Sequence, residues 1–153
     1  LPIAQKLLDP TQHLFVTVIS ASASVDMRLG APPDESARLV ESDKQEKLAI
    51  EAIKGGLYAE ARSAARSAIE IREKLFGKEH PELIEPLRIL GNALTELRAL
   101  EEAATVLARA LELSERAYGK AHPQTALVLD RIGWLQIYQS KKPRLRCVVR
   151  CSF

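Results

Sequence analysis

The sequence predicts an all-α protein, a solenoid made of about two and a half repeats of a helix-turn-helix unit. A segment at residues 68–81 recurs 42 residues later at residues 110–123, and seven of the fourteen aligned positions are identical. Apolar residues within each repeat follow the 3.6-residue period of an α-helix. Glycine and proline stand at matching positions between these periodic stretches, where they end one helix and begin the next.

The second helix of the middle repeat is expected to carry a narrow apolar stripe that is rich in alanine. Its members recur at a spacing of three or four residues, which places them on one face of the helix. Small side chains on that face allow a neighbouring helix to approach closely. The stripe consists of Leu100, Ala103, Ala104, Leu107, Ala110 and Leu111.

Turn residues predict where the helices end and begin. Glycine tolerates the backbone conformation that ends a helix, and proline needs no hydrogen-bond partner at a helix start. Pro86 cannot donate a backbone hydrogen bond, so we expect either a bend there or a helix start near Glu85. The expected helix ends and starts are marked by Gly77, Gly119, Pro81 and Pro123.

The pattern of one full repeat resembles the tetratricopeptide repeat. The 42-residue period and the Gly-x-x-His-Pro junction are similar to the repeats of the kinesin light chain type. The resemblance covers roughly residues 43–140 and implies a protein-binding scaffold. Its signature positions are filled by Leu87, Leu90, Gly91, Leu94, Ala103 and Ala110.

The chain divides into an N-terminal segment, the repeats and a basic tail. Residues 1–42 form the first segment, and its Ser, Ala, Gly and Pro content over residues 20–36 indicates a linker. The third repeat is only partial, so we expect marginal stability unless residues 1–42 act as a cap. The repeats are expected at residues 43–76, 81–118 and 123–140, and the tail at residues 141–153.

Composition narrows the class of protein further. The chain has 22 Lys and Arg against 20 Asp and Glu, 46% apolar residues and no run long enough for a membrane span. Cys147 and Cys151 lie close together near the end, so they do not form a disulfide framework, and free thiols are expected rather than a metal site. This cysteine usage favours a cytoplasmic location, while Lys141-Lys142-Pro143-Arg144 gives a weaker argument for a nuclear one. The tail lacks aromatic residues, which disfavours nucleic-acid binding.

The N-terminal residues allow two further interpretations. The chain opens with Leu1 rather than methionine, which suggests a fragment or a processed product. The apolar run at residues 14–19 has six residues, which is short for a cleaved secretory signal and favours a short buried strand or helix turn.

Catalytic motifs are not found in the sequence. It contains no glycine-rich phosphate loop, metalloprotease motif or nucleophile elbow, so we predict no enzyme activity, no cofactor and no metal site. His80 and His122 recur 42 residues apart, which could indicate a metal pair. Each precedes a helix-starting proline, so a structural role at the junction is favoured.

The family resemblance places the candidate site on the concave face, where the first helices of successive repeats contact a bound peptide. Arg88 and Asn92 correspond to positions that hold a carboxylate clamp in chaperone-binding members, but Glu46 and Asp130 disfavour a chaperone tail. Trp134 either forms an apolar anchor pocket beside Ile137 and Tyr138 or packs against the missing second helix of the third repeat or the C-terminal tail. The candidate residues are Glu46, Ile50, Ile53, Arg88, Asn92, Thr95, Asp130, Trp134 and Ile137.

The sequence therefore predicts a module that binds a peptide or helix of another protein on its concave face. One alternative is the non-catalytic helical part of a larger enzyme, either a SET/MYND-type methyltransferase or a kinase. Another is a structural repeat that self-assembles into a homo-oligomer through its incomplete third unit.

Overall fold

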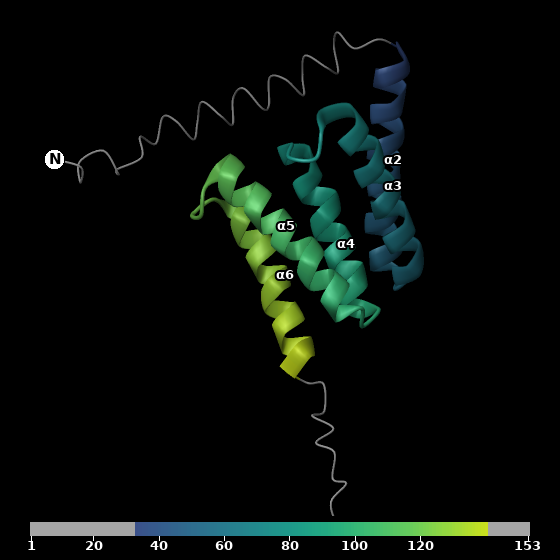
Figure 1. The fold of residues 1–153 in the computed structure, drawn as a ribbon. Helices are drawn as coiled ribbons and strands as arrows, with labels where there is room; N and C mark the ends of the chain where they lie inside the picture. The colour runs from purple at the N-terminus through teal and green to yellow at the C-terminus, as the bar shows by residue number, and fades with distance from the viewer. Residues whose placement is uncertain (1–32, 141–153) are drawn as a thin grey trace, which may run out of the picture.

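The computed structural model describes residues 33–140, which form five α-helices and one short 3₁₀ turn and contain no strand. The helix pairs follow one another across the molecule, with α2 and α3 at one side and α6 at the other (Figure 1). The predictions made for residues 1–32, for Cys147 and Cys151 and for the basic tail lie outside the described residues. The elements are α2 (Pro33–Lys54), α3 (Tyr58–Phe76), η2 (Pro81–Leu83), α4 (Ile84–Glu96), α5 (Leu100–Tyr118) and α6 (Pro123–Ser140).

Helix α2 begins ten residues before the expected start of the first repeat at residue 43. Pro33 is its first residue, a position where a backbone N–H would have no intrahelical acceptor, so its absence costs nothing. The carboxylates of Asp34 and Glu35 in the first turn interact favourably with the positive end of the helix dipole. Leu39 is buried against the rest of the first helix pair. The first helix of repeat one is therefore longer than the repeat pattern predicted.

The second helices end where the sequence predicted. Helices α3 and α5 stop at Phe76 and Tyr118, and both following glycines, Gly77 and Gly119, adopt a φ of 88°. Side chains with a Cβ rarely occupy this region, which explains why glycine stands at both ends.

The two junction histidines have matching structural roles. Nδ1 of His80 accepts a hydrogen bond from the Glu82 N–H at 3.3 Å, and Nδ1 of His122 accepts one from the Gln124 N–H at 3.2 Å. The His80 ring stacks on Phe76 and the His122 ring on Tyr118, with centroids 4.6 and 4.8 Å apart. The predicted junction role is confirmed for both histidines.

Pro86 lies in the first turn of α4, which begins at Ile84 after the 3₁₀ turn. The first turn of a helix has no intrahelical acceptors for its N–H groups, so proline is tolerated there. The expected helix start near Glu85 is therefore confirmed, and a bend is not needed.

Acidification is expected to weaken the junction at His80. Burial lowers the pKa of the His80 imidazole, although the Glu82 carboxylate opposes this shift. The neutral ring is the form that accepts the hydrogen bond, so its contribution to stability is complete above the unfolded pKa of about 6.5 and is lost as the pH falls below that value. The melting temperature should fall more steeply between about pH 7.5 and 5.5 in the wild type than in His80→Asn, because asparagine caps a helix without titrating.

The comparison between the two proteins removes the contribution of the other titrating groups, which are common to both. Equal pH dependence of the melting temperature in the wild type and in His80→Asn would contradict this assignment.

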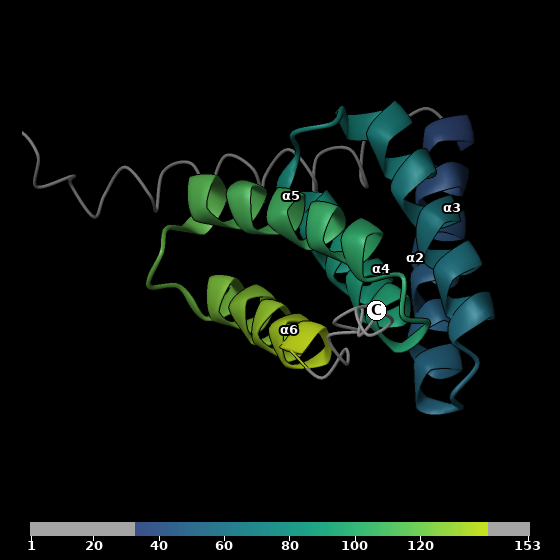
Figure 2. The ribbon, with the colours of Figure 1, turned by 60° about the horizontal axis from the view of Figure 1, so that its bottom comes forward.

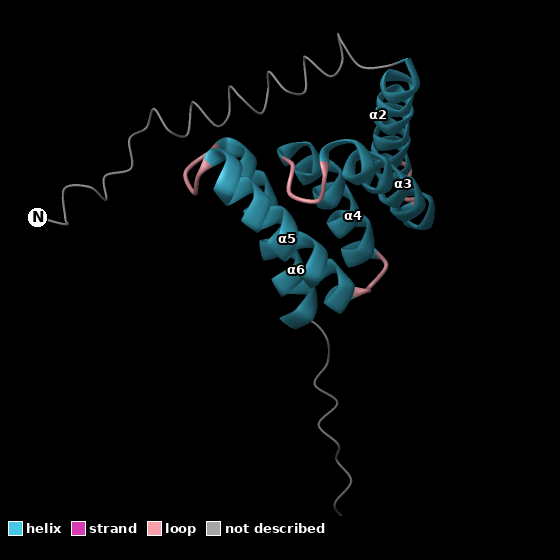
Figure 3. Cartoon of the chain, turned by 45° about the horizontal axis from the view of Figure 1, so that its top comes forward, coloured by secondary structure: helices cyan, strands magenta, loops and turns pink. Residues whose placement is uncertain are grey.

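The core lies where α4 packs between α3 and α5, and α6 packs on α5 (Figure 2). Gly91 on α4 permits the closest approach, since a Cβ there would lie 2.5 Å from Cγ of Leu107 on α5. Helix α4 also contacts α2 and α6, so the first helices of the three repeats are successive neighbours along one side. Within the described residues, short loops connect these helices (Figure 3).

Candidate functional site

A groove with a volume of about 430 Å³ lies between α4 and α6, on the side formed by the first helices. Three of the nine predicted site residues, Asn92, Thr95 and Trp134, line it together. The other lining residues are Tyr138, which was expected beside Trp134 in an anchor pocket, and Glu96 and Arg131, which were not predicted.

Trp134 and Ile137 remain accessible on α6. The relative exposure of Trp134 is 50% and that of Ile137 is 43%, which are high values for large apolar residues. Thr95 is buried, and its hydroxyl donates to the Gly91 carbonyl at 2.7 Å. The groove therefore exposes an aromatic side chain that a ligand could contact. The Thr95 hydroxyl is not available to a ligand as a donor, because it already donates to Gly91.

A polar cluster closes one end of the groove. The Tyr138 hydroxyl lies 3.1 Å from both carboxylate oxygens of Glu96, and this hydrogen bond raises the pKa of Tyr138, with burial as a further cause. The Arg98 guanidinium carbon lies 4.3 Å from the centre of the Tyr138 ring, which is a cation–π distance. The cluster joins α6 to the turn between α4 and α5.

Arg98 adopts a backbone conformation that is unusual for its type. Its φ is 63°, and the residue 42 positions earlier, Gly56, has a φ of 75° in a turn with the same backbone hydrogen bonds. Outside glycine, such a conformation costs about 1 kcal/mol. The contact with Tyr138 offsets part of this cost, which is consistent with a specific role for arginine at this turn.

Arg131 supplies a second guanidinium beside the groove. Its Nε forms an ion pair with the Asp130 carboxylate at 3.7 Å, a distance too long for a hydrogen bond. Asp130 itself is exposed. Arg131 and Asn92 therefore place donor groups on opposite helices of the same groove.

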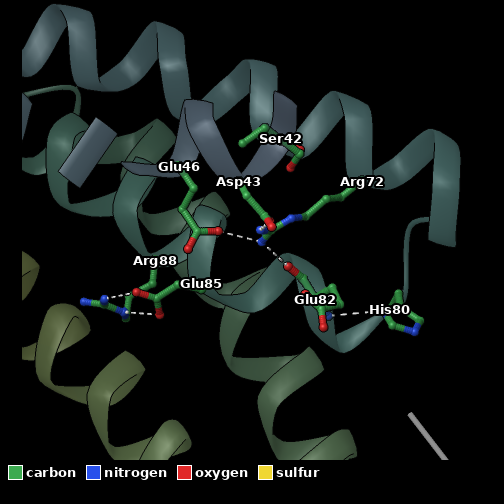
Figure 4. A network of polar contacts seen from close by, with 9 residues as sticks. Ser42, Asp43, Glu46, Arg72, His80, Glu82, Glu85 and Arg88 are labelled. Carbon is green, nitrogen blue, oxygen red and sulfur yellow. Dashed lines mark hydrogen bonds and ion pairs between the residues drawn. The ribbon is translucent and has the colours of Figure 1, made fainter. Parts of the chain in front are cut away.

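The candidate residues nearer the N-terminus are held in a polar network (Figure 4). Buried Arg72 on α3 contacts the Glu46 carboxylate at 2.6 Å and the Asp43 carboxylate at 2.9 Å, and it donates to the Glu82 carbonyl at 2.9 Å. Burial raises the pKa of Glu46, and Arg72 opposes that shift. Arg72 therefore links the first helix pair to the start of the second, and Glu46 is one of its partners within the first pair.

Arg88 is also paired within its own helix. Its Nε donates to Glu85 at 3.0 Å, and its Nη2 makes a further contact with the same carboxylate. Ile50 and Ile53 are only partly exposed and pack against the core. The predicted residues therefore do not form one continuous site, because the accessible groups gather between α4 and α6.

The missed residues had weak sequence signals. Tyr138 is not one of them, because it follows Trp134 by four residues on one face of α6 and was expected beside it. Glu96 and Arg98 lie at the end of a helix and in a turn, and their contact with Tyr138 depends on tertiary packing. The helix period does not predict that contact.

The architecture defines a helical-repeat protein, a solenoid whose first helices border a groove and whose second helices cover them. Residues 45–111 match the family model described as the tetratricopeptide repeat, which supports this family for the chain. No curated protein matches the sequence. Such repeats generally serve as protein-interaction modules.

Two further kinds of site were sought in residues 33–140. None of the helices in this range is long and apolar enough to cross a membrane. The same range contains no group of three or more His, Cys, Asp or Glu residues placed to hold a metal ion.

Proposed function

We propose that this chain binds a peptide segment of another protein in the groove between α4 and α6. The observation that carries the proposal is the combination of accessible Trp134 with the polar side chains of Arg131 and Asn92 around one cavity. We also propose that the repeats are of the kinesin light chain-like type, a proposal that the 42-residue period supports.

The groove fits a segment that pairs an apolar side chain with an acidic or polar group. The indole of Trp134 provides apolar contact in the groove, and aromatic residues of this kind often dominate binding energy. Ile137 does not line the groove, but it is exposed three residues further along α6 and would extend the apolar contact. A carboxylate or carbonyl of the peptide would accept hydrogen bonds from Arg131 and Asn92. We assign this role to Arg131 rather than Arg88, because Arg131 lines the groove, whereas Arg88 does not and is held by two contacts with Glu85.

The proposal is tested by selecting peptides from a random displayed library against the full chain. Affinities of the selected peptides are then measured by fluorescence anisotropy with a fluorescein label. Trp134→Ala and Arg131→Gln should each weaken binding by at least about tenfold, which corresponds to about 1.4 kcal/mol. Since Trp134 is the only tryptophan in the chain, its emission should also shift when an unlabelled, tryptophan-free peptide binds.

Leu129→Ala provides a matched control for this experiment. Leu129 is 45% exposed and also lies on α6, but it does not line the groove. This variant should bind the selected peptides with unchanged affinity. Equal affinity of the wild type, Trp134→Ala and Arg131→Gln would refute binding in this groove.

A further inference from the structure

A second groove, at the opposite end of the solenoid, has a volume of about 540 Å³ and is formed by α2 and α3. Its apolar lining includes Leu48 and Leu57, which are 49% and 51% exposed. Its charged lining residues, Glu51 and Glu60, are both acidic. This surface is separate from the groove of the proposed function.

The corresponding surface of the next repeat shows which side chains pack on such a groove. A corresponding groove between the first and second repeats, about 370 Å³ in volume, is formed by residues of α4 and α5 and is partly covered by Ile69 and its neighbours on α3. Leu90 in that groove is 4% exposed, whereas Leu48, which stands 42 positions earlier, is 49% exposed. Five pairs of lining residues in the two grooves stand 42 positions apart in the sequence. These pairs are Gln45 and Leu87, Leu48 and Leu90, Ser63 and Thr105, Ala64 and Val106, and Ser67 and Arg109.

An ion pair at the corresponding groove indicates which charge an occupant of the open groove should carry. Arg66 on α3 pairs with Glu102 on α5 at the edge of the corresponding groove. The residue 42 positions before Glu102 is Glu60, an acidic lining residue of the open groove. A segment that occupies the open groove should therefore bring large apolar side chains and a cation.

We propose that residues 6–19 of the same chain cover the groove between α2 and α3. Leu48 lies about 22 Å along α2 from Pro33, at a rise of 1.5 Å per residue. The 14 residues from Ile19 to Pro33 span up to about 46 Å, so residues 6–19 reach the groove, whereas residues immediately before Pro33 cannot. The segment supplies the cation of Lys6 and the apolar side chains of Leu7, Leu8, Leu14, Phe15, Val18 and Ile19.

Photo-crosslinking in the full chain tests this assignment. Leu57 is replaced by the photoreactive residue p-benzoylphenylalanine, and equal amounts of ¹⁴N- and ¹⁵N-labelled protein are mixed, irradiated, digested with trypsin and analysed by mass spectrometry. The expected product joins position 57 to the tryptic peptide of residues 7–28 within one chain. The same photoreactive residue at exposed Glu112 measures the background of random contacts and should not give this product.

Three other outcomes of the crosslinking experiment would each overturn the proposal. A product that joins ¹⁴N- and ¹⁵N-labelled chains would identify a second copy as the occupant. A product with residues 141–153 would identify the tail, and a yield no higher than at Glu112 would show that the groove is open.

Hydrogen exchange provides a second measurement in the full chain. Leu48→Glu should increase amide exchange in residues 7–28 at least about threefold, while exchange in α5 and α6 stays unchanged. Leu129→Glu, an equally exposed site on α6, should leave residues 7–28 at the wild-type rate. Unchanged exchange in Leu48→Glu would refute the docking.

Discussion

Replacing Arg72 with methionine is expected to lower the free energy of unfolding by about 3 kcal/mol. The Arg72 side chain is only 5% exposed, and its guanidinium contacts two carboxylates of α2 and a carbonyl of η2. Removal of one partner from a buried ion pair leaves the other charge without compensation, which typically costs about 3–5 kcal/mol. We take the lower value because the Asp43 carboxylate is 35% exposed and water partly solvates it.

The Arg72 prediction is checked by urea denaturation followed by circular dichroism. Arg116→Met is the control, because Arg116 pairs with Glu79 at the surface, where water screens the ion pair, so its loss should change the free energy of unfolding much less. Adding Glu46→Gln to Arg72→Met should recover part of the lost stability, since it removes the charge that Arg72 had neutralised. If Arg72→Met and Arg116→Met unfold at the same urea concentration, the network does not stabilise the fold.

The Arg72 network also shows where the repeat pattern stops being informative. The residue 42 positions after Arg72 is Ser114. In the structure Ser114 is buried and its hydroxyl lies 2.8 Å from that of Thr125. Both positions join a second helix to the start of the next repeat, but the chemistry differs, and comparison of the repeats could not reveal the shared role.

Local signals predicted the helix boundaries well because they depend on short-range backbone chemistry. Gly77 and Gly119 end helices through their φ values, and Pro123 begins one through its missing N–H. The start of α2 was not predicted, since the apolar residues after Pro33 do not form a regular stripe. Its position became clear only from the packing of residues such as Leu39.

The candidate site was predicted in part, because repeat position determines which helix face a residue occupies but not whether it is free. Asn92 and Trp134 do border one groove. Arg88 was also expected on the concave face, yet its guanidinium is paired with Glu85. Sequence spacing alone did not show that Glu85 would compete with a peptide for Arg88. The contact of Arg98 with Tyr138 could be identified only from the structure, since 40 residues separate the two in the chain.

Replacement of Gly91 by alanine is expected to lower the free energy of unfolding by about 1–2 kcal/mol, while the same change at Gly133 should raise it by up to about 1 kcal/mol. A Cβ at position 91 would lie 2.5 Å from Cγ and Cδ2 of Leu107, which is fully buried and cannot move aside without disturbing the core. Overpacking of this kind costs about 1–3 kcal/mol, and the better helix propensity of alanine offsets part of that cost.

Gly133 is the matched control, because it stands 42 positions after Gly91 in the next repeat. No atom of the described residues lies within 4 Å of a Cβ at that position, so alanine there should gain only its helix propensity. Thermal melts of both variants in the full chain should move in opposite directions from the wild type. A lower melting temperature for Gly133→Ala as well would mean that another segment or another chain packs closely on this face of α6 in solution, as Leu107 packs on Gly91.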